Sequence, residues 1–354
     1  MNRTAVEPGE ATDPGAGPGA AGTGPDPGRA PVLLRRVLVL GAVGAALALL
    51  TVFLINLVSL LVLRHPFVGF SDAILTDSEA VATGHLQYGN PATQFVGFPY
   101  SPLYVWLVAG LLRIFWWPGW GTAVSMVAAL GSIAALARPL WRAMQTLEQR
   151  VVAVSFVVAV ALGGLAALPI VSGAPLNGLD GRPDQLAWCL LVVGGTLVFG
   201  ALLSGRPPRL RRQLSIGALL AASVATKQTT AVPALLLAAI ALAAPALVER
   251  SWRRPLRQWM LDATVAATLG LSLVVLGLVL QLASHGFAID IMTTMQLRYE
   301  RIVLLGSELG RTLRLLLVPL GALVVLTGCT VRSMRAHREL YDRRHRVVAG
   351  AAVL

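Results

Sequence analysis

Apolar residues along this chain fall into long runs, separated by short polar segments rich in arginine. The first run extends from Val37 to Leu63 without a charged residue, and its 27 residues exceed the about 7 to 15 of a signal-peptide core. Several later runs approach the roughly 20 residues that cross a hydrocarbon core about 30 Å thick. The pattern predicts an all-α, polytopic helical membrane protein. The eight expected spans are residues 37–63, 121–137, 151–171, 185–203, 213–229, 231–248, 260–284 and 312–331.

The segment 102–117 is apolar but short, and it carries Arg113. Trp116, Trp117 and Trp120 cluster at its end, where a tryptophan belt is typical of a membrane interface. We therefore expect a helix that lies at or dips into the outer interface without crossing it. This choice fixes the side of the membrane on which every later loop falls.

The charge pattern assigns those sides. The net charge is +12, but the arginines lie in short clusters between apolar runs, as the positive-inside rule predicts, so we expect no nucleic-acid partner. With eight spans and a cytosolic N-terminus, 21 of the 29 basic residues are cytosolic, and the eight outer ones are matched by eight acidic residues. The expected location is the plasma (inner) membrane.

The composition divides the chain into three parts. The first is a disordered cytosolic tail rich in Gly, Pro and Ala, the second is the transmembrane domain with three outer loops, and the third is a basic cytosolic segment with the start of a possible ninth span. The parts are residues 1–31, residues 32–331 with outer loops 64–120, 172–184 and 285–311, and residues 332–354. The chain is expected to be short at its C-terminus.

Lys227 is the single lysine of the chain, and it lies inside an apolar stretch. An ionisable group at membrane depth is costly and indicates function, although a lysine near a helix end also snorkels to the surface. The charge count puts Lys227 at the outer end of a hairpin whose arms, 213–229 and 231–248, turn near Pro233. Its side chain is thus expected to reach water on the outer face.

Other outer charges are expected on the same face. They are the acidic cluster Asp72, Asp77 and Glu79, the Arg182-Pro183-Asp184 turn, and Lys227-Gln228. Turns that only connect two spans do not need large loops with balanced positive and negative charges, so this set of residues is a candidate site. The alternative is a solvated loop whose surface ion pairs each contribute less than about 1 kcal/mol.

Five short motifs resemble the membrane-embedded glycosyltransferases of the GT-C fold, within the protein mannosyltransferase and aminoarabinose transferase-like branch, glycosyltransferase family 39. Each motif is weak alone, but their order and shared membrane side are fairly specific. The resemblance covers roughly residues 37–250. The motifs are Asp77-Ser78-Glu79, Tyr88-Gly89-Asn90-Pro91, Phe98-Pro99-Tyr100-Ser101-Pro102-Leu103-Tyr104, Arg182-Pro183-Asp184 and Thr226-Lys227-Gln228-Thr229. The acids are spaced Asp-x-Glu instead of adjacent, and members of the fold usually have more spans.

The resemblance implies an inverting transfer of a sugar from a polyprenyl-phosphate donor to a glycan, lipid or protein acceptor on the outer face. A phosphate departs without a general acid if its charge is held, so the chemistry needs one base and one or more cations. Asp77 is the candidate base, with Asp72 and Glu79 as alternatives. Lys227 and Arg182, with Gln228 beside them, are candidates for the phosphate, and Asp184 for orienting Arg182 or the acceptor.

Two other classes of function stay open. A secondary transporter or lipid flippase would show repeated halves and charges near the bilayer midplane, which the sequence does not display. An inactive scaffold subunit of a cell-envelope glycosylation complex fits the early end of the chain. We expect no cofactor and no metal, although some relatives of the fold hold a divalent ion with carboxylates.

Overall fold

The computed structural model describes residues 70–90, 101–143, 183–204, 209–249 and 255–295, with residue 93 and scattered positions in 40–58 and 150–158. The expected tail, the span at 312–331, the C-terminal segment and most of the span at 151–171 lie outside these residues. So does Arg182. All helices from α2 onward belong to one compact unit.

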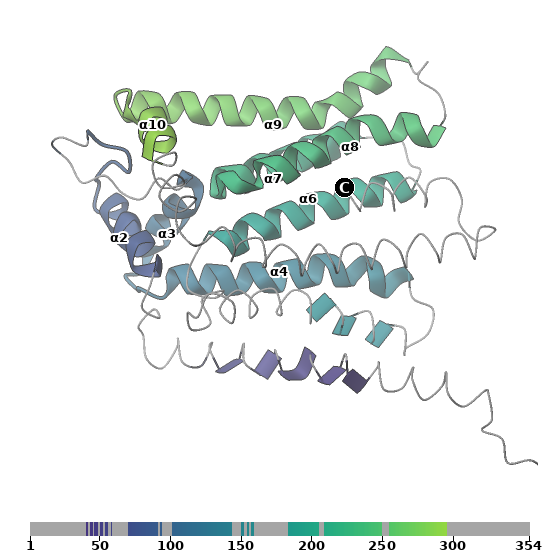
Figure 1. Ribbon diagram of the computed structural model, residues 1–354, viewed down its shortest axis with the longest axis horizontal. Helices are drawn as coiled ribbons and strands as arrows, with labels where there is room; N and C mark the ends of the chain where they lie inside the picture. Colours follow the sequence, from purple (N-terminus) through teal and green to yellow (C-terminus); the bar gives the residue numbers. More distant parts are fainter. Residues whose placement is uncertain are drawn as a thin grey trace, which may run out of the picture. The chain divides into compact units, whose positions relative to one another are not determined.

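The described residues are mostly helical (Figure 1), and they contain no β-strand, which confirms the all-α prediction for this part of the chain. The helices are α2 (Phe70–Ala82), α3 (Pro102–Ile114), α4 (Trp120–Ala143), α6 (Asp184–Ser204), α7 (Leu210–Thr226), α8 (Ala231–Glu249), α9 (Leu256–Ala283) and α10 (Phe287–Asp290), with a 3₁₀ turn η2 (Gln228–Thr230) and a π-helical turn η3 (Ile291–Met295).

Four of the described helices are long and apolar enough to cross a membrane, so the chain is a helical membrane protein. These stretches are Trp120–Pro139, Asp184–Ser204, Gln228–Ala246 and Leu256–Ala283. They match the spans predicted at 121–137, 185–203, 231–248 and 260–284. At 13 residues, α3 is about 20 Å long and too short to cross as a straight helix, in agreement with the sequence.

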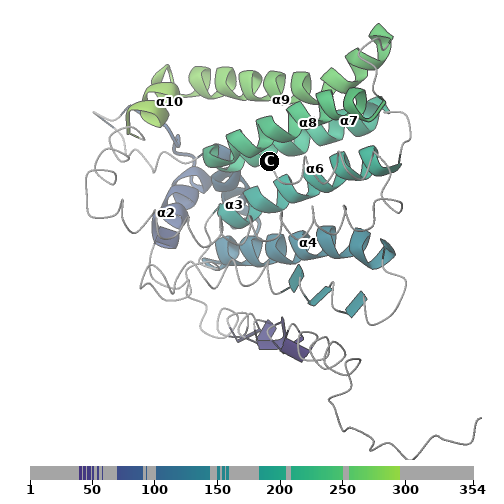
Figure 2. The same ribbon diagram turned by 45° about the vertical axis from the view of Figure 1, so that its right-hand side comes forward.

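The predicted span at 213–229 forms α7, but it is not one of these four helices. It has 17 residues and a length of about 26 Å, and Arg211 and Arg212 lie in its first turn. Even so, α7 packs against α6, α8 and α9 around one apolar core (Figures 1 and 2). Leu220 of α7 and Val265 of α9 are completely buried there.

A close approach between α7 and α9 depends on Gly217. A Cβ atom placed on Gly217 would lie 2.6 Å from the Cβ of Thr268 and 2.8 Å from the carbonyl oxygen of Val265. Real Cβ atoms essentially never show contacts this short, and one of the two atoms belongs to the backbone of α9, so the two helices would have to separate. Small residues that let backbones approach are typical of helix packing in membranes.

We therefore expect Gly217→Ala to lower the free energy of unfolding by about 1 to 3 kcal/mol, the usual cost of overpacking. Thermal unfolding in lipid nanodiscs measures the change. Gly270→Ala on α9 is the matched control, because a Cβ there meets nothing within 4 Å. The control should be neutral or slightly stabilising, since alanine favours helix over glycine. Equal unfolding temperatures for both variants would contradict the close contact.

Three polar contacts fix the direction of α7 against α6. The Nη2 group of Arg212 donates to the Leu197 carbonyl oxygen (2.7 Å), the Ser223 hydroxyl donates to the Ala187 carbonyl oxygen (2.7 Å), and Lys227 pairs with Asp184. From the start to the end of α7, the successive partners on α6 have decreasing residue numbers, so the two helices are antiparallel. The start of α6, the end of α7 and the start of α8 therefore lie together, and we call this the Asp184 end of the bundle.

Helices α2 and α3 pack at the Asp184 end. Ile74 of α2 and Tyr104 of α3 share a buried cluster with Leu186 of α6 and Trp120 of α4, and the last two residues lie in the first turns of their helices. The Tyr104 hydroxyl donates to the Gly121 carbonyl oxygen (2.7 Å), which ties α3 to the first turn of α4. Two helices of the first predicted outer loop, α2 and α3, thus pack over one end of the long helices (Figure 2).

Candidate active site

Lys227 lies at a break between two helices. Helix α7 ends at Thr226, Lys227 has extended backbone angles (φ −152°, ψ 121°), and η2 leads directly into α8. The predicted turn near Pro233 is wrong, because the chain turns at residues 227–230. Pro233 lies in the first turn of α8, where the missing N–H group of proline leaves no hydrogen bond unmade.

Buried hydroxyl groups hold this break in place. The Ser223 hydroxyl lies 3.0 Å from the Thr230 hydroxyl, which donates to the Lys227 carbonyl oxygen at 2.9 Å. Ser223 and Thr230 are almost completely buried, and so is Thr226. Backbone groups freed by a helix break at membrane depth need such partners. The Ser and Thr residues around Lys227 thus have a structural role, which is to stabilise the helix break.

Asp184 is the ion-pair partner of Lys227. The lysine Nζ atom donates to the Asp184 Oδ1 atom, and the two side chains keep 23% and 31% of their exposure. Asp184 begins α6, where the helix dipole favours a carboxylate. The sequence placed both residues in the site but paired Asp184 with Arg182 or the acceptor. Because the ammonium is partly exposed and its three N–H groups exceed the one bond to Asp184, it can still bind a second anion.

Among the candidate bases whose side chains are described, Asp77 is the buried one, with 3% exposure. It lies in the middle of α2, and Glu79 on the same helix is only half-buried. Two residues correspond to a rotation of about 200° around a helix, so the two carboxylates point to different sides, as the sequence predicted for a helical segment. Asp72 belongs to the first turn of α2, but its side chain lies outside the described atoms.

The pKa of the Tyr88 phenol is sensitive to the charge of Asp77. Tyr88 follows α2 in the chain, is 2% exposed, and packs against Leu280 of α9. Burial raises the pKa of its phenol far above the usual value, and the Asp77 carboxylate raises it further. Both effects disfavour the negatively charged phenolate.

The Asp77→Asn variant is therefore expected to have a lower Tyr88 pKa than the wild type, although burial still keeps it above about 10. The native chain holds the proton more tightly than the unfolded chain, so wild-type stability should fall as pH rises above about 10. Ultraviolet difference spectroscopy of tyrosinate formation measures the pKa, and Tyr88→Phe identifies the signal. An unchanged titration in Asp77→Asn would contradict the electrostatic effect of Asp77 on Tyr88.

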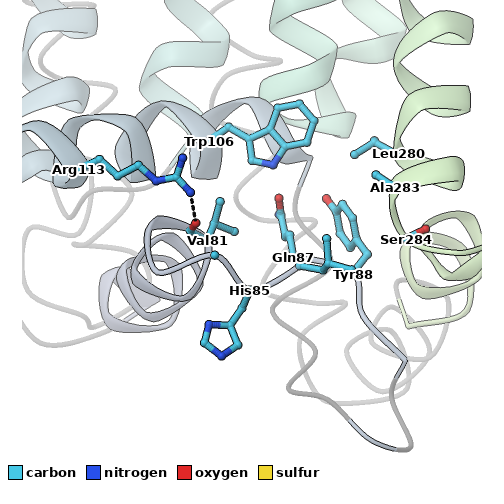
Figure 3. A pocket seen from close by; sticks show the side chains of 11 residues that line it. Val81, His85, Gln87, Tyr88, Trp106, Arg113, Leu280, Ala283 and Ser284 are labelled. Atoms are coloured by element: carbon cyan, nitrogen blue, oxygen red, sulfur yellow. Dashed lines mark hydrogen bonds between the residues drawn. The ribbon is translucent and has the colours of Figure 1, made fainter.

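A pocket opens next to Tyr88, between the segment after α2, one face of α3 and the end of α9 (Figure 3). Its volume is about 180 Å³. On one side, Arg113 of α3 donates to the carbonyl oxygens of Val81 (2.9 Å) and Ala82 (3.0 Å), so it satisfies the last turn of α2. This pocket was not predicted from the sequence. Tyr88 was recognised as part of a motif and Arg113 as an outer charge, but nothing indicated that the two residues line the same pocket.

The structure brings only some of the predicted site residues into direct contact. Lys227 and Asp184 touch, and the half-buried Gln228 begins η2 beside them. Asp77 lies at the same end of the bundle, because Ile74, one turn earlier on α2, shares a cluster with Leu186, two residues after Asp184. Within the described ranges, no group of three His, Cys, Asp or Glu side chains is placed to hold a metal ion. The absence of a metal stays a prediction.

Comparison with known proteins gives no match to a protein-family model, to a curated protein or to a solved structure. The resemblance drawn from the motifs is therefore used below only for a proposal.

Proposed function

We propose that this chain is a membrane-embedded, inverting glycosyltransferase of the GT-C type. It moves a sugar from a polyprenyl-phosphate donor to a hydroxyl of a glycan, lipid or protein. The observation that carries the proposal is the partly exposed Lys227–Asp184 pair at a helix break, at the same end of the bundle as the buried Asp77. A cation and a carboxylate on one face are what this reaction needs.

Lys227 has the phosphate-binding role in this proposal. Its ammonium group has three N–H donors, one of which is used by Asp184, and charge-assisted bonds to phosphate are among the strongest hydrogen bonds in proteins. The negative charge that develops on the leaving phosphate is then stabilised in the transition state. Gln228 follows Lys227 directly and adds an amide, and Arg182, two residues before Asp184, is the second candidate cation.

Asp77 is the proposed base. Its carboxylate takes the proton of the acceptor hydroxyl while the acceptor oxygen bonds to the anomeric carbon. The bond from that carbon to the phosphate oxygen breaks on the opposite side, and the electron pair leaves with the phosphate. A single displacement of this kind inverts the anomeric configuration. Two observations support this role: Asp77 is the buried carboxylate of α2, and its charge acts on Tyr88, which lines an open pocket.

The charge count gives the proposed orientation. The N-terminus is cytosolic, and the Asp184 end of the bundle faces outward from the plasma (inner) membrane, where eight spans of the GT-C type would present the site to a lipid-linked donor. The four described spanning helices and the short α3 are compatible with this arrangement.

Mass spectrometry of lipid extracts tests the proposal. Cells that lack this chain should accumulate one polyprenyl-phosphate sugar, and the wild-type chain should restore the normal level. The transporter alternative predicts a different result, namely substrate uptake into liposomes without a covalent product. A scaffold subunit would restore the level equally well with Lys227→Ala. Either of the last two results would contradict the proposal.

A further inference from the structure

The pocket beside Tyr88 has the size of a single ring. Its volume of about 180 Å³ is slightly larger than an engineered protein cavity of about 150 Å³ that binds benzene. Ligand pockets for larger molecules begin near about 300 Å³. One six-membered ring with its substituents fits this space, and an oligosaccharide does not.

The walls of the pocket combine an aromatic face with two polar side chains. Trp106 is 37% exposed and forms one wall, and Leu280 of α9 forms another. Figure 3 shows the side chains of Gln87 and Tyr88 extending toward Trp106 from the opposite wall. An indole packs against the apolar face of a ring, while an amide and a phenol exchange hydrogen bonds with hydroxyl groups.

The charges around the pocket disfavour an anionic ligand. Arg113 already donates from Nε and Nη2 to the carbonyl oxygens that end α2. The imidazole of His85 points away from the pocket in Figure 3. The Asp77 carboxylate is close enough to Tyr88 to raise the pKa of its phenol, so it adds negative potential on the inner side. A ring with hydroxyl groups and without negative charge is the chemistry that suits these walls.

We propose that this pocket binds one neutral monosaccharide unit, and that this unit belongs to the acceptor. The inference rests on the proposed function and narrows it, because it makes the acceptor a glycan or glycolipid and not a protein. Neither Lys227 nor Asp184 lines the pocket, whereas Tyr88 joins it to the proposed base Asp77. The donor phosphate and the acceptor ring thus have separate places at the Asp184 end.

Binding of simple methyl glycosides tests the assignment. Saturation-transfer NMR on the full chain in nanodiscs should detect at least one of the methyl glycosides of glucose, galactose, mannose, rhamnose and arabinose, and no comparable binding of cyclohexanol. Trp106→Ala should weaken binding at least about tenfold. Ala283→Phe should do the same by filling the pocket without removing a contact. Trp188→Ala, on an exposed part of α6 outside the pocket, is the control and should bind normally.

Three results would overturn the inference: no glycoside binds the wild type, cyclohexanol binds equally well, or both pocket variants bind like the wild type. The Lys227→Ala variant tests whether the ring belongs to the acceptor or to the donor. It should still bind methyl glycosides, and a loss of glycoside binding in this variant would assign the ring to the donor. If glycosides bind the pocket but no sugar is transferred from a polyprenyl phosphate, the proposed function fails alone. If transfer occurs and the pocket variants bind and transfer normally, the pocket assignment fails alone.

Discussion

Replacing Lys227 with alanine is expected to lower the rate of sugar transfer by about 10² to 10³-fold, the usual loss when one group that stabilises developing negative charge is removed. The chain should stay folded. The Lys227–Asp184 pair is partly exposed, and such a pair contributes about 1 kcal/mol or less to stability. The buried Ser223–Thr230 contact still holds the helix break in the variant.

Two further variants make this result specific. Arg209→Ala removes a cation from the opposite end of the same helix, where the side chain is exposed, and should transfer sugar at the wild-type rate. Asp184→Asn keeps a hydrogen-bond acceptor for Lys227 but removes the competing negative charge, so its loss should be much smaller than that of Lys227→Ala. Initial rates with a polyprenyl-phosphate sugar measure all three. Transfer by Lys227→Ala within twofold of the wild type would remove Lys227 from the mechanism.

The second large effect is expected at Asp77. Asp77→Asn preserves the shape of the buried side chain but cannot accept the acceptor proton, and a positioned general base contributes about 10² to 10⁴-fold to a rate. The loss should appear in the chemical step, with little change in the binding of methyl glycosides at the pocket. Single-turnover measurements with bound donor separate the rate of the chemical step from acceptor binding.

Glu79→Gln is the matched control for Asp77→Asn, because it removes a carboxylate from the same helix on a different side. It should retain most of the activity, and Asp72→Asn decides the remaining alternative within the acidic cluster. If Asp77→Asn transfers sugar normally while one of the other two is inactive, the base has been assigned to the wrong carboxylate.

The long helices were predictable from the sequence because their ends have local chemical causes. The apolar run at 185–203 becomes the helix Asp184–Ser204, with Pro183 and Asp184 as start residues. The run at 260–284 becomes Leu256–Ala283, which begins directly after Pro255. The hairpin turn was misplaced because Pro233 looked like a turn residue, whereas the break depends on Ser223 and Thr230, which meet only when α6, α7 and η2 pack together.

The candidate site was only partly predictable for the same reason. The charge count places Lys227 and Asp184 on one membrane face, but their direct contact spans 43 residues of sequence and depends on the antiparallel register of α6 and α7. The pocket likewise needs Tyr88, Trp106 and Leu280 from three separate segments. No local pattern gives the distance between such segments. The motif around Tyr88 could therefore be recognised in the sequence, but the cavity beside it could not be predicted.

Transfer by the purified chain tests the central claim most directly. The wild-type protein and Lys227→Ala are placed in lipid vesicles with a radiolabelled polyprenyl-phosphate sugar and a glycan acceptor, and the product is separated and its anomeric configuration determined. We predict a covalent glycoside of inverted configuration with the wild type and at least a hundredfold less with Lys227→Ala. No covalent product with the wild type, or equal product with both chains, would contradict the account.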